Sequence, residues 1–208
     1  MVAPAPAPLI LFAHGAGAPS SSPWMRRWAE RLGALGLVVP FDYPYMRERR
    51  KLPDRLPALI AAHAEALAAA EAAHPGRPVV LAGKSMGSRV GCHLSVQRAR
   101  EGRPVAALVC FGYPLRAAGS GALRDQVLRE LTTPILFLQG SRDELCPPGD
   151  LAAVRPAMAA PHELHLVEGG DHSLEVRKRD PGPAQAEHDE ALLQAIARFL
   201  ARHTAGAA

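Results

Sequence analysis

The chain of 208 residues is long enough to bury the core of one domain and leaves little room for a second. A hydrophobic content of 48% and a charged content of 21% are typical of a soluble globular protein, and aromatic residues make up only 5%. No apolar stretch reaches the roughly 18 residues that a bilayer span requires, so we expect no membrane partner.

The net charge of +4 does not by itself indicate a nucleic-acid partner. The basic residues are scattered apart from one run at 47–51, which lacks the interleaved aromatic residues that stack on bases. We expect a solvated loop there, with an anion-attracting rim or a docking surface as alternatives. The 3 cysteines have no metal-ligand spacing and an odd count, and the start of the chain has no export signal. These features predict a cytoplasmic protein without a metal site.

Predicted strands and helices alternate along the chain. Residues 1–8 alternate alanine and proline and predict a disordered lead-in, followed by a single domain over 9–203. Continuous apolar runs predict six strands, at 9–13, 37–41, 79–82, 105–111, 135–138 and 164–167. Apolar residues at helical spacing predict intervening helices, among them one that begins after Pro53 and Asp54, one over Leu123–Leu131 and a last one around 192–200.

This alternation predicts an α/β fold with a six-stranded parallel sheet and helices on both faces. The strand around Val38 is expected at one edge. Ligands bind at the carboxyl ends of the strands in such sheets, so the loops that follow the strands should gather at one rim. The short stretch between Phe111 and Ile135 leaves room for a loop and one helix, and we therefore expect no lid domain.

A serine stands between two glycines at a predicted strand-to-helix turn, in the sequence Gly83-Lys84-Ser85-Met86-Gly87. A nucleophilic serine takes this form on a sharp, strained turn. Glycine is needed on either side because Cβ atoms at Gly83 and Gly87 would crowd the adjacent strand and helix. The pattern is also common by chance, so its interpretation depends on the other loops of the rim.

A serine hydroxyl needs a neutral imidazole to accept its proton and a carboxylate to orient that imidazole. His172 follows a Gly-Gly turn after the last predicted strand and is the candidate base. Asp143 lies in a tight polar turn after the fifth strand and is the favoured acid, with Glu144, Asp150 and Asp171 as rivals.

The glycine-rich loop after the first predicted strand, at 14–19, has a different predicted role. A tetrahedral intermediate needs two preorganised N–H donors for its oxyanion. We expect one donor from the backbone of Met86 and the other from Ala16 or Gly15. Considered alone, this loop would be a simple strand-to-helix turn. We assign substrate contacts to four further residues, which are His14, Gly17, Tyr43 and Tyr113.

Together these residues resemble the α/β-hydrolase superfamily, specifically its small, cap-less, dienelactone-hydrolase-like members, and most closely a group without a defined substrate. The resemblance is carried by 14–19, 41–46, 83–89, 111–115, 140–143 and 171–173, and so covers the whole domain. It implies a triad of Ser85, Asp143 and His172 in the superfamily's chain order. Two features depart from the family: there is no room for the two extra strands that commonly open the sheet, and dienelactone hydrolases use cysteine where this chain has Ser85.

The residues and the resemblance predict a serine hydrolase that cleaves carboxylic esters, or thioesters, through an acyl-serine intermediate. Two alternatives are a catalytically silent scaffold within a larger assembly and an amide or peptide hydrolase that uses the same site. We expect a small acyl substrate as the partner, and neither a metal nor an organic cofactor. The sequence does not predict the oligomeric state.

Overall fold

The computed structural model describes residues 6–180 and 182–205. It contains one six-stranded sheet in the order β2-β1-β3-β4-β5-β6, in which every neighbouring pair is parallel. The predicted parallel sheet, with the Val38 strand at an edge, is therefore confirmed. The strands are β1 (Leu9–Ala13), β2 (Leu37–Phe41), β3 (Val79–Lys84), β4 (Ala107–Phe111), β5 (Ile135–Gly140) and β6 (His162–Val167).

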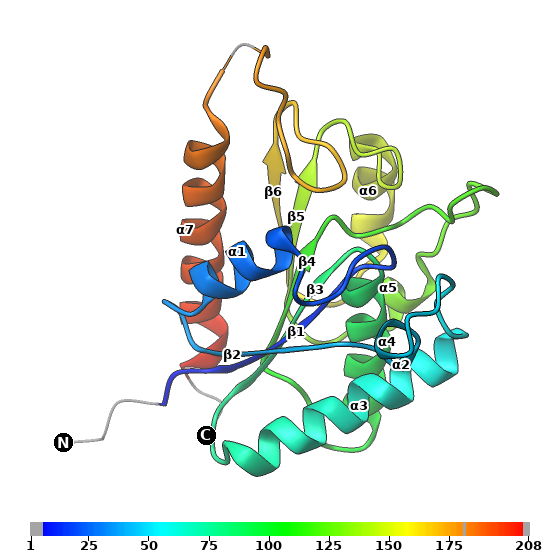
Figure 1. The fold of residues 1–208 in the computed structure, drawn as a ribbon, viewed down its shortest axis with the longest axis vertical. Helices are drawn as coiled ribbons and strands as arrows, with labels where there is room; N and C mark the ends of the chain where they lie inside the picture. Colours follow the sequence, from blue (N-terminus) through cyan, green and yellow to red (C-terminus); the bar gives the residue numbers. More distant parts are fainter. Residues whose placement is uncertain (1–5, 181, 206–208) are drawn as a thin grey trace.

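Helices cover both faces of the sheet (Figure 1). One face carries α1 (Pro23–Leu32) and α7 (Gln185–Thr204). The other carries α3 (Leu56–Ala73), α4 (Met86–Arg100), α5 (Gln126–Glu130) and α6 (Pro148–Val154). The short helix α2 (Pro44–Arg47) follows β2, and a 3₁₀ turn, η1 (Arg155–Ala157), follows α6.

Alternate residues of each strand divide the buried core into two layers. Leu11 of β1 belongs to the same buried cluster as Leu67 of α3. The next residue, Phe12, belongs to a cluster on the other face with Trp28 of α1 and Phe199 of α7. Successive side chains of a strand point to opposite faces, so an unbroken apolar run supplies both layers at once.

The alanine-rich helix α3 is long and apolar enough to cross a membrane, judged by length and composition only. Its buried residues, which are Leu59, His63, Leu67 and Ala70, face the body of the domain. The helix packs against β1 and α4. We therefore interpret α3 as a core helix of the domain.

The strand order places a crevice at the carboxyl edge of the sheet, between β1 and β3. The chain leaves β1 toward α1 on one face and leaves β3 toward α4 on the opposite face (Figure 1). Ligands bind in α/β sheets at such a switch point, because neighbouring loops diverge there. The loop at 14–22 and Ser85 lie on its two sides.

The helix predicted over Leu123–Leu131 is wrong in its extent. Helix α5 covers only Gln126–Glu130, because Leu123 instead forms an isolated antiparallel bridge with Arg116. This bridge closes the loop between β4 and α5, and the side chain of Leu123 is exposed. The segment between β4 and β5 thus holds one short helix and no lid.

Two other segments refine the sequence predictions. Residues 1–5 of the predicted disordered lead-in lie outside the described residues, but Pro8 is buried and its carbonyl accepts the Leu37 N–H at 2.9 Å. In the basic run at 47–51, Arg50 forms ion pairs with Glu48 at 2.7 Å and Asp54 at 2.8 Å. The rest of that run is exposed.

Candidate active site

Ser85 occupies a strained turn between β3 and α4, with φ at +49° and ψ at −115°. Residues other than glycine rarely adopt such a backbone, and it persists only where the surroundings impose it. A Cβ on Gly87 would lie 2.6 Å from the carbonyl oxygen of Ala13, and one on Gly83 would meet the backbone of Gly87. Glycine is therefore required on both sides of the serine, as the sequence predicted.

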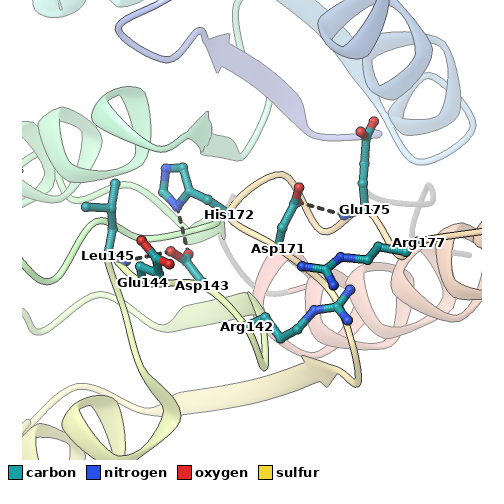
Figure 2. Close-up of a pocket in the computed structure, with 8 residues that line it drawn as sticks. All are labelled: Arg142, Asp143, Glu144, Leu145, Asp171, His172, Glu175 and Arg177. Carbon is teal, nitrogen blue, oxygen red and sulfur yellow. Dashed lines mark hydrogen bonds and ion pairs between the residues drawn. The ribbon is translucent and has the colours of Figure 1, made fainter. Parts of the chain in front are cut away.

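Three loops bring the predicted serine, histidine and aspartate together. The Ser85 Oγ lies 2.7 Å from Nε2 of His172, and Nδ1 of the same ring lies 2.7 Å from Oδ2 of Asp143. Figure 2 shows His172 and Asp143 pointing toward one another from their separate loops. The ring is partly exposed at 28%, whereas the Asp143 side chain is fully buried. This geometry orients the imidazole so that Nε2 faces the serine hydroxyl.

The buried carboxylate of Asp143 accepts two hydrogen bonds besides the one from His172. The Leu145 N–H donates to Oδ1 at 2.8 Å, and the Gln139 side-chain amide donates to Oδ2. Gln139 is itself buried, and its Oε1 accepts the Tyr113 N–H at 3.0 Å. Sequence reasoning missed Gln139, although a polar residue in an otherwise apolar strand was a usable signal.

The rival carboxylates have other partners. Asp171 accepts the N–H groups of Ser173 and Glu175 on its Oδ1, as expected of a turn residue. Asp150 pairs with Arg116, and this pairing lowers the pKa of its carboxyl. Glu144 is exposed. Within the described structure, none of the three hydrogen-bonds to the His172 ring.

The loop after β1 is held by two buried side chains. Nδ1 of His14 donates to the Gly15 carbonyl at 2.6 Å, and its Nε2 accepts the Tyr43 N–H at 3.1 Å. Because Nε2 accepts the Tyr43 N–H, the ring is neutral and carries its proton on Nδ1, and burial also lowers the pKa of His14. The Tyr45 hydroxyl donates to the Ala16 carbonyl at 3.0 Å, and burial raises its pKa to about 12.

The hydrogen bond from His14 to the Gly15 carbonyl fixes the direction of the Ala16 N–H. The Gly15 carbonyl and the Ala16 N–H belong to one planar trans peptide unit and point in opposite directions. A hydrogen bond that holds the carbonyl therefore also aims the N–H. Among the described residues, neither the Ala16 N–H nor the Met86 N–H donates to a protein acceptor.

Three of the four residues predicted to contact substrate have side chains that lie away from the pocket beside Ser85. The side chains of His14, Tyr43 and Tyr113 are completely buried, and none of them lines the pocket beside Ser85. They pack behind the rim because rings of this size complete the core beneath the strand ends. Only Gly17 of the four lines that pocket.

The pocket beside Ser85 has a volume of about 430 Å³. Its apolar wall includes Trp24 and Met25 of α1, and its polar wall includes Lys84, His172 and Glu175. Gly15, Ala16 and Gly17 of the loop after β1 also line it. Volume and lining are typical of a site for a small organic molecule.

A second hollow of about 380 Å³ lies against the other side of His172 and Asp143, and Ser85 does not line it. Figure 2 shows its charged lining, with Arg142 and Arg177 near Asp171. Arg142 also forms an ion pair, at 2.6 Å, with Asp180, which Figure 2 does not draw. The hollow is lined by these two arginines and by four carboxylates, those of Asp143, Glu144, Asp171 and Glu175, so acidic side chains are in excess there.

No cluster of three or more potential metal ligands occurs within residues 6–180 and 182–205. All three cysteines are buried and free.

Comparison with known proteins gives a consistent picture. A family model described as an alpha/beta hydrolase domain matches residues 6–201. An alpha-beta serine hydrolase homologue from Coxiella burnetii is 18% identical, with a TM-score of 0.73 over 95% of this chain and 86% of that one. A dienelactone hydrolase from Anabaena variabilis is 20% identical, with a TM-score of 0.71 over 96% and 88%. The RedJ thioesterase of the prodiginine pathway in Streptomyces coelicolor is 22% identical, with a TM-score of 0.66 over 96% and 90%.

Proposed function

Since this chain belongs to the alpha/beta hydrolase family, we propose that it is a serine hydrolase that cleaves carboxylic esters or thioesters through an acyl-Ser85 intermediate. One observation carries the proposal: His172 lies 2.7 Å from the Ser85 hydroxyl and 2.7 Å from the buried Asp143. The arrangement has the distances at which a base activates a serine nucleophile.

In the proposed first step, Ser85 Oγ attacks the acyl carbonyl while its proton passes to Nε2 of His172. The ring becomes a cation, and Asp143 stabilises that cation through Nδ1. The leaving alcohol or thiol then takes the proton from Nε2, and the acyl group remains on Ser85. Water activated by the same nitrogen releases the acid and restores the hydroxyl.

The oxyanion of each tetrahedral intermediate would accept hydrogen bonds from the N–H groups of Ala16 and Met86. Their lack of protein acceptors within the described residues supports this role, since unpaired donors at a rim are free to bind a ligand. His14, through the Gly15 carbonyl, holds the Ala16 donor in place before the substrate arrives, and Tyr45 holds the peptide unit that follows. Such preorganisation contributes because the donors need not reorient as charge develops.

The pocket beside Ser85 is the proposed site for the acyl group. Trp24 and Met25 provide apolar surface, and the volume of about 430 Å³ suits a small or medium acyl chain. The Coxiella homologue, the dienelactone hydrolase and the thioesterase share this fold, which supports a hydrolase but does not select between oxygen and sulfur esters. A cytoplasmic location stays a prediction.

Labelling with a fluorophosphonate probe tests the nucleophile directly. The wild-type protein should form a covalent adduct on Ser85 and should hydrolyse p-nitrophenyl butyrate. Ser85→Ala should show neither, with kcat lowered by about 10³-fold or more. The matched control is Ser120→Ala on an exposed loop, which should label and turn over like the wild type.

An activity that persists in Ser85→Ala would reject the serine mechanism. A folded wild-type protein that neither labels nor turns over any member of a panel of acyl esters and thioesters would reject the hydrolase itself. The same panel, varied in acyl length and in oxygen against sulfur, identifies the substrate class.

A further inference from the structure

Lys84 lies between Gly83 and Ser85 in the nucleophile turn, and the proposed mechanism does not use its side chain. That side chain is half-buried and lines the pocket together with Ser85 and His172. Its Nζ donates a hydrogen bond to the main-chain carbonyl of His172, at 2.5 Å. The residue that precedes the serine is thus connected directly to the backbone of the histidine.

A second donor holds the next carbonyl of the same loop. Nε1 of Trp24, on α1, donates to the Ser173 carbonyl at 3.0 Å. The Lys84 ammonium also lies 5.4 Å from the centre of the Trp24 ring, within the range of a cation–π contact. The Trp24 ring in turn packs edge-on against Phe111 of β4, with ring centres 5.5 Å apart. Lys84 and Trp24 therefore form one clamp on the histidine loop.

The histidine loop depends on side-chain contacts such as these because its described residues between β6 and α7 form no helix or strand. Leu174, two residues past the histidine, has φ at +63°, a strained value for a leucine. The imidazole and the carbonyl of His172 share one Cα atom. A contact that fixes the carbonyl therefore limits where Nε2 can lie relative to the serine.

The cost of burying Lys84 indicates a role other than stability. Burial lowers the pKa of its ammonium to about 8, against the opposing attraction of Asp143, Asp171 and Glu175. A burial that disfavours the charged form is unfavourable for folding at neutral pH. An apolar side chain of similar length would fill the same space without that cost.

We propose that Lys84 is a positioning residue, which acts through the main chain of His172 to hold the imidazole against Ser85. The inference deepens the proposed function and rests on it. The hydrogen bond and the aromatic contact of the Lys84 ammonium both go to the protein, which favours a positioning role over a role in substrate binding. Misplacement of a reacting group by about 1 Å can cost on the order of 10²-fold in rate.

The test compares Lys84→Met and Lys84→Gln with the matched control Lys178→Met, which removes an exposed lysine. With p-nitrophenyl butyrate, both Lys84 variants should lower kcat by about 10- to 100-fold while KM stays within about twofold. The control should keep both constants. A folded Lys84 variant whose kcat stays within about threefold of wild type overturns the proposal, as does a variant that raises KM alone.

A second readout does not depend on turnover. Long-range ¹H–¹⁵N spectra of the histidine rings, assigned with His172→Gln, report the tautomer and the mobility of the His172 ring. The wild type and Lys178→Met should show one ordered form with the proton on Nδ1, and the Lys84 variants should show a shifted or broadened signal. An identical signal in all of them overturns the proposal. Absence of Ser85-dependent turnover in the wild type would instead reject the proposed function. The spectra would still decide whether Lys84 positions the His172 ring.

Discussion

Substitution of Gly87 by alanine should destabilise the protein through a backbone clash at the nucleophile turn. A Cβ at this position would lie 2.6 Å from the Ala13 carbonyl oxygen and 2.7 Å from that of His14. Ordinary contact begins at 3.4 Å, so the new atom is roughly 0.8 Å too close. The neighbouring atoms belong to the backbone, and no side chain can rotate away to make room.

The magnitude follows from the cost of overpacking. An added methyl group in a closely packed site costs about 1–3 kcal/mol, and a clash with backbone belongs near the upper end of that range. In a chain of this size each kcal/mol lowers Tm by about 2–4 °C, which gives an expected decrease of about 6–12 °C. Because the clash displaces the end of β1, the oxyanion loop should move with it and kcat should fall too.

Thermal unfolding followed by circular dichroism measures this effect, with Gly149→Ala as the matched control. Gly149 lies in the first turn of α6, and a Cβ there would meet no atom within 4 Å. That variant should unfold at or slightly above the wild-type temperature, because alanine restricts the unfolded chain. Equal Tm values for Gly87→Ala and Gly149→Ala would refute the argument from close approach.

Three further predictions concern buried polar groups. Gln139→Leu removes a donor to Asp143 and should lower kcat about 10-fold with a stability loss of about 1–3 kcal/mol; unchanged steady-state kinetics would show that the amide is dispensable. Tyr45→Phe removes the hydroxyl that holds the Ala16 carbonyl and should lower kcat by about threefold to tenfold, with KM unchanged; a change in KM alone would contradict a role in the oxyanion loop. Burial lowers the pKa of His63 from 6.5 to about 3, so between these values the unfolded chain binds a proton that the folded chain excludes. Stability should therefore be greatest above pH 6.5 and fall by up to about 1.4 kcal/mol per pH unit as the pH decreases toward 3. Urea unfolding at pH 7, 6 and 5 should show a shallower decrease for His63→Gln, and an equal slope would count against this explanation.

Several elements could be predicted because their signals are local. The apolar run at 9–13 is an all-buried strand, and its composition alone required cover on both faces. The two glycines around Ser85 indicated a close backbone approach, which the structure locates at the end of β1 for Gly87 and at the start of α4 for Gly83. The extent of α5 could not be predicted in this way, because Leu123 pairs with Arg116 across a loop rather than continuing the helical stripe.

The candidate site was only partly predictable for the same reason. The motifs identified the loops that carry Ser85 and His172, and the fold brings these loops to one rim. Nothing local to Tyr43 or Tyr113 indicates whether its ring faces solvent or the core, and both are buried. The contact of Lys84 was missed because it reaches a residue of a distant loop, whereas Gln139 lies only four residues before its partner Asp143 and was missed although it is a polar residue in an apolar strand.

The sequence by itself determined the alternation of elements, the parallel sheet and the residue types at the strand ends, since backbone preference and hydrophobic period are properties of short segments. Only the tertiary structure decided which carboxylate meets the imidazole, which rings lie beneath the rim and which amides stay unpaired among the described residues. Those outcomes depend on the packing of segments far apart in the chain, and the direction of a side chain is fixed only when that packing is complete.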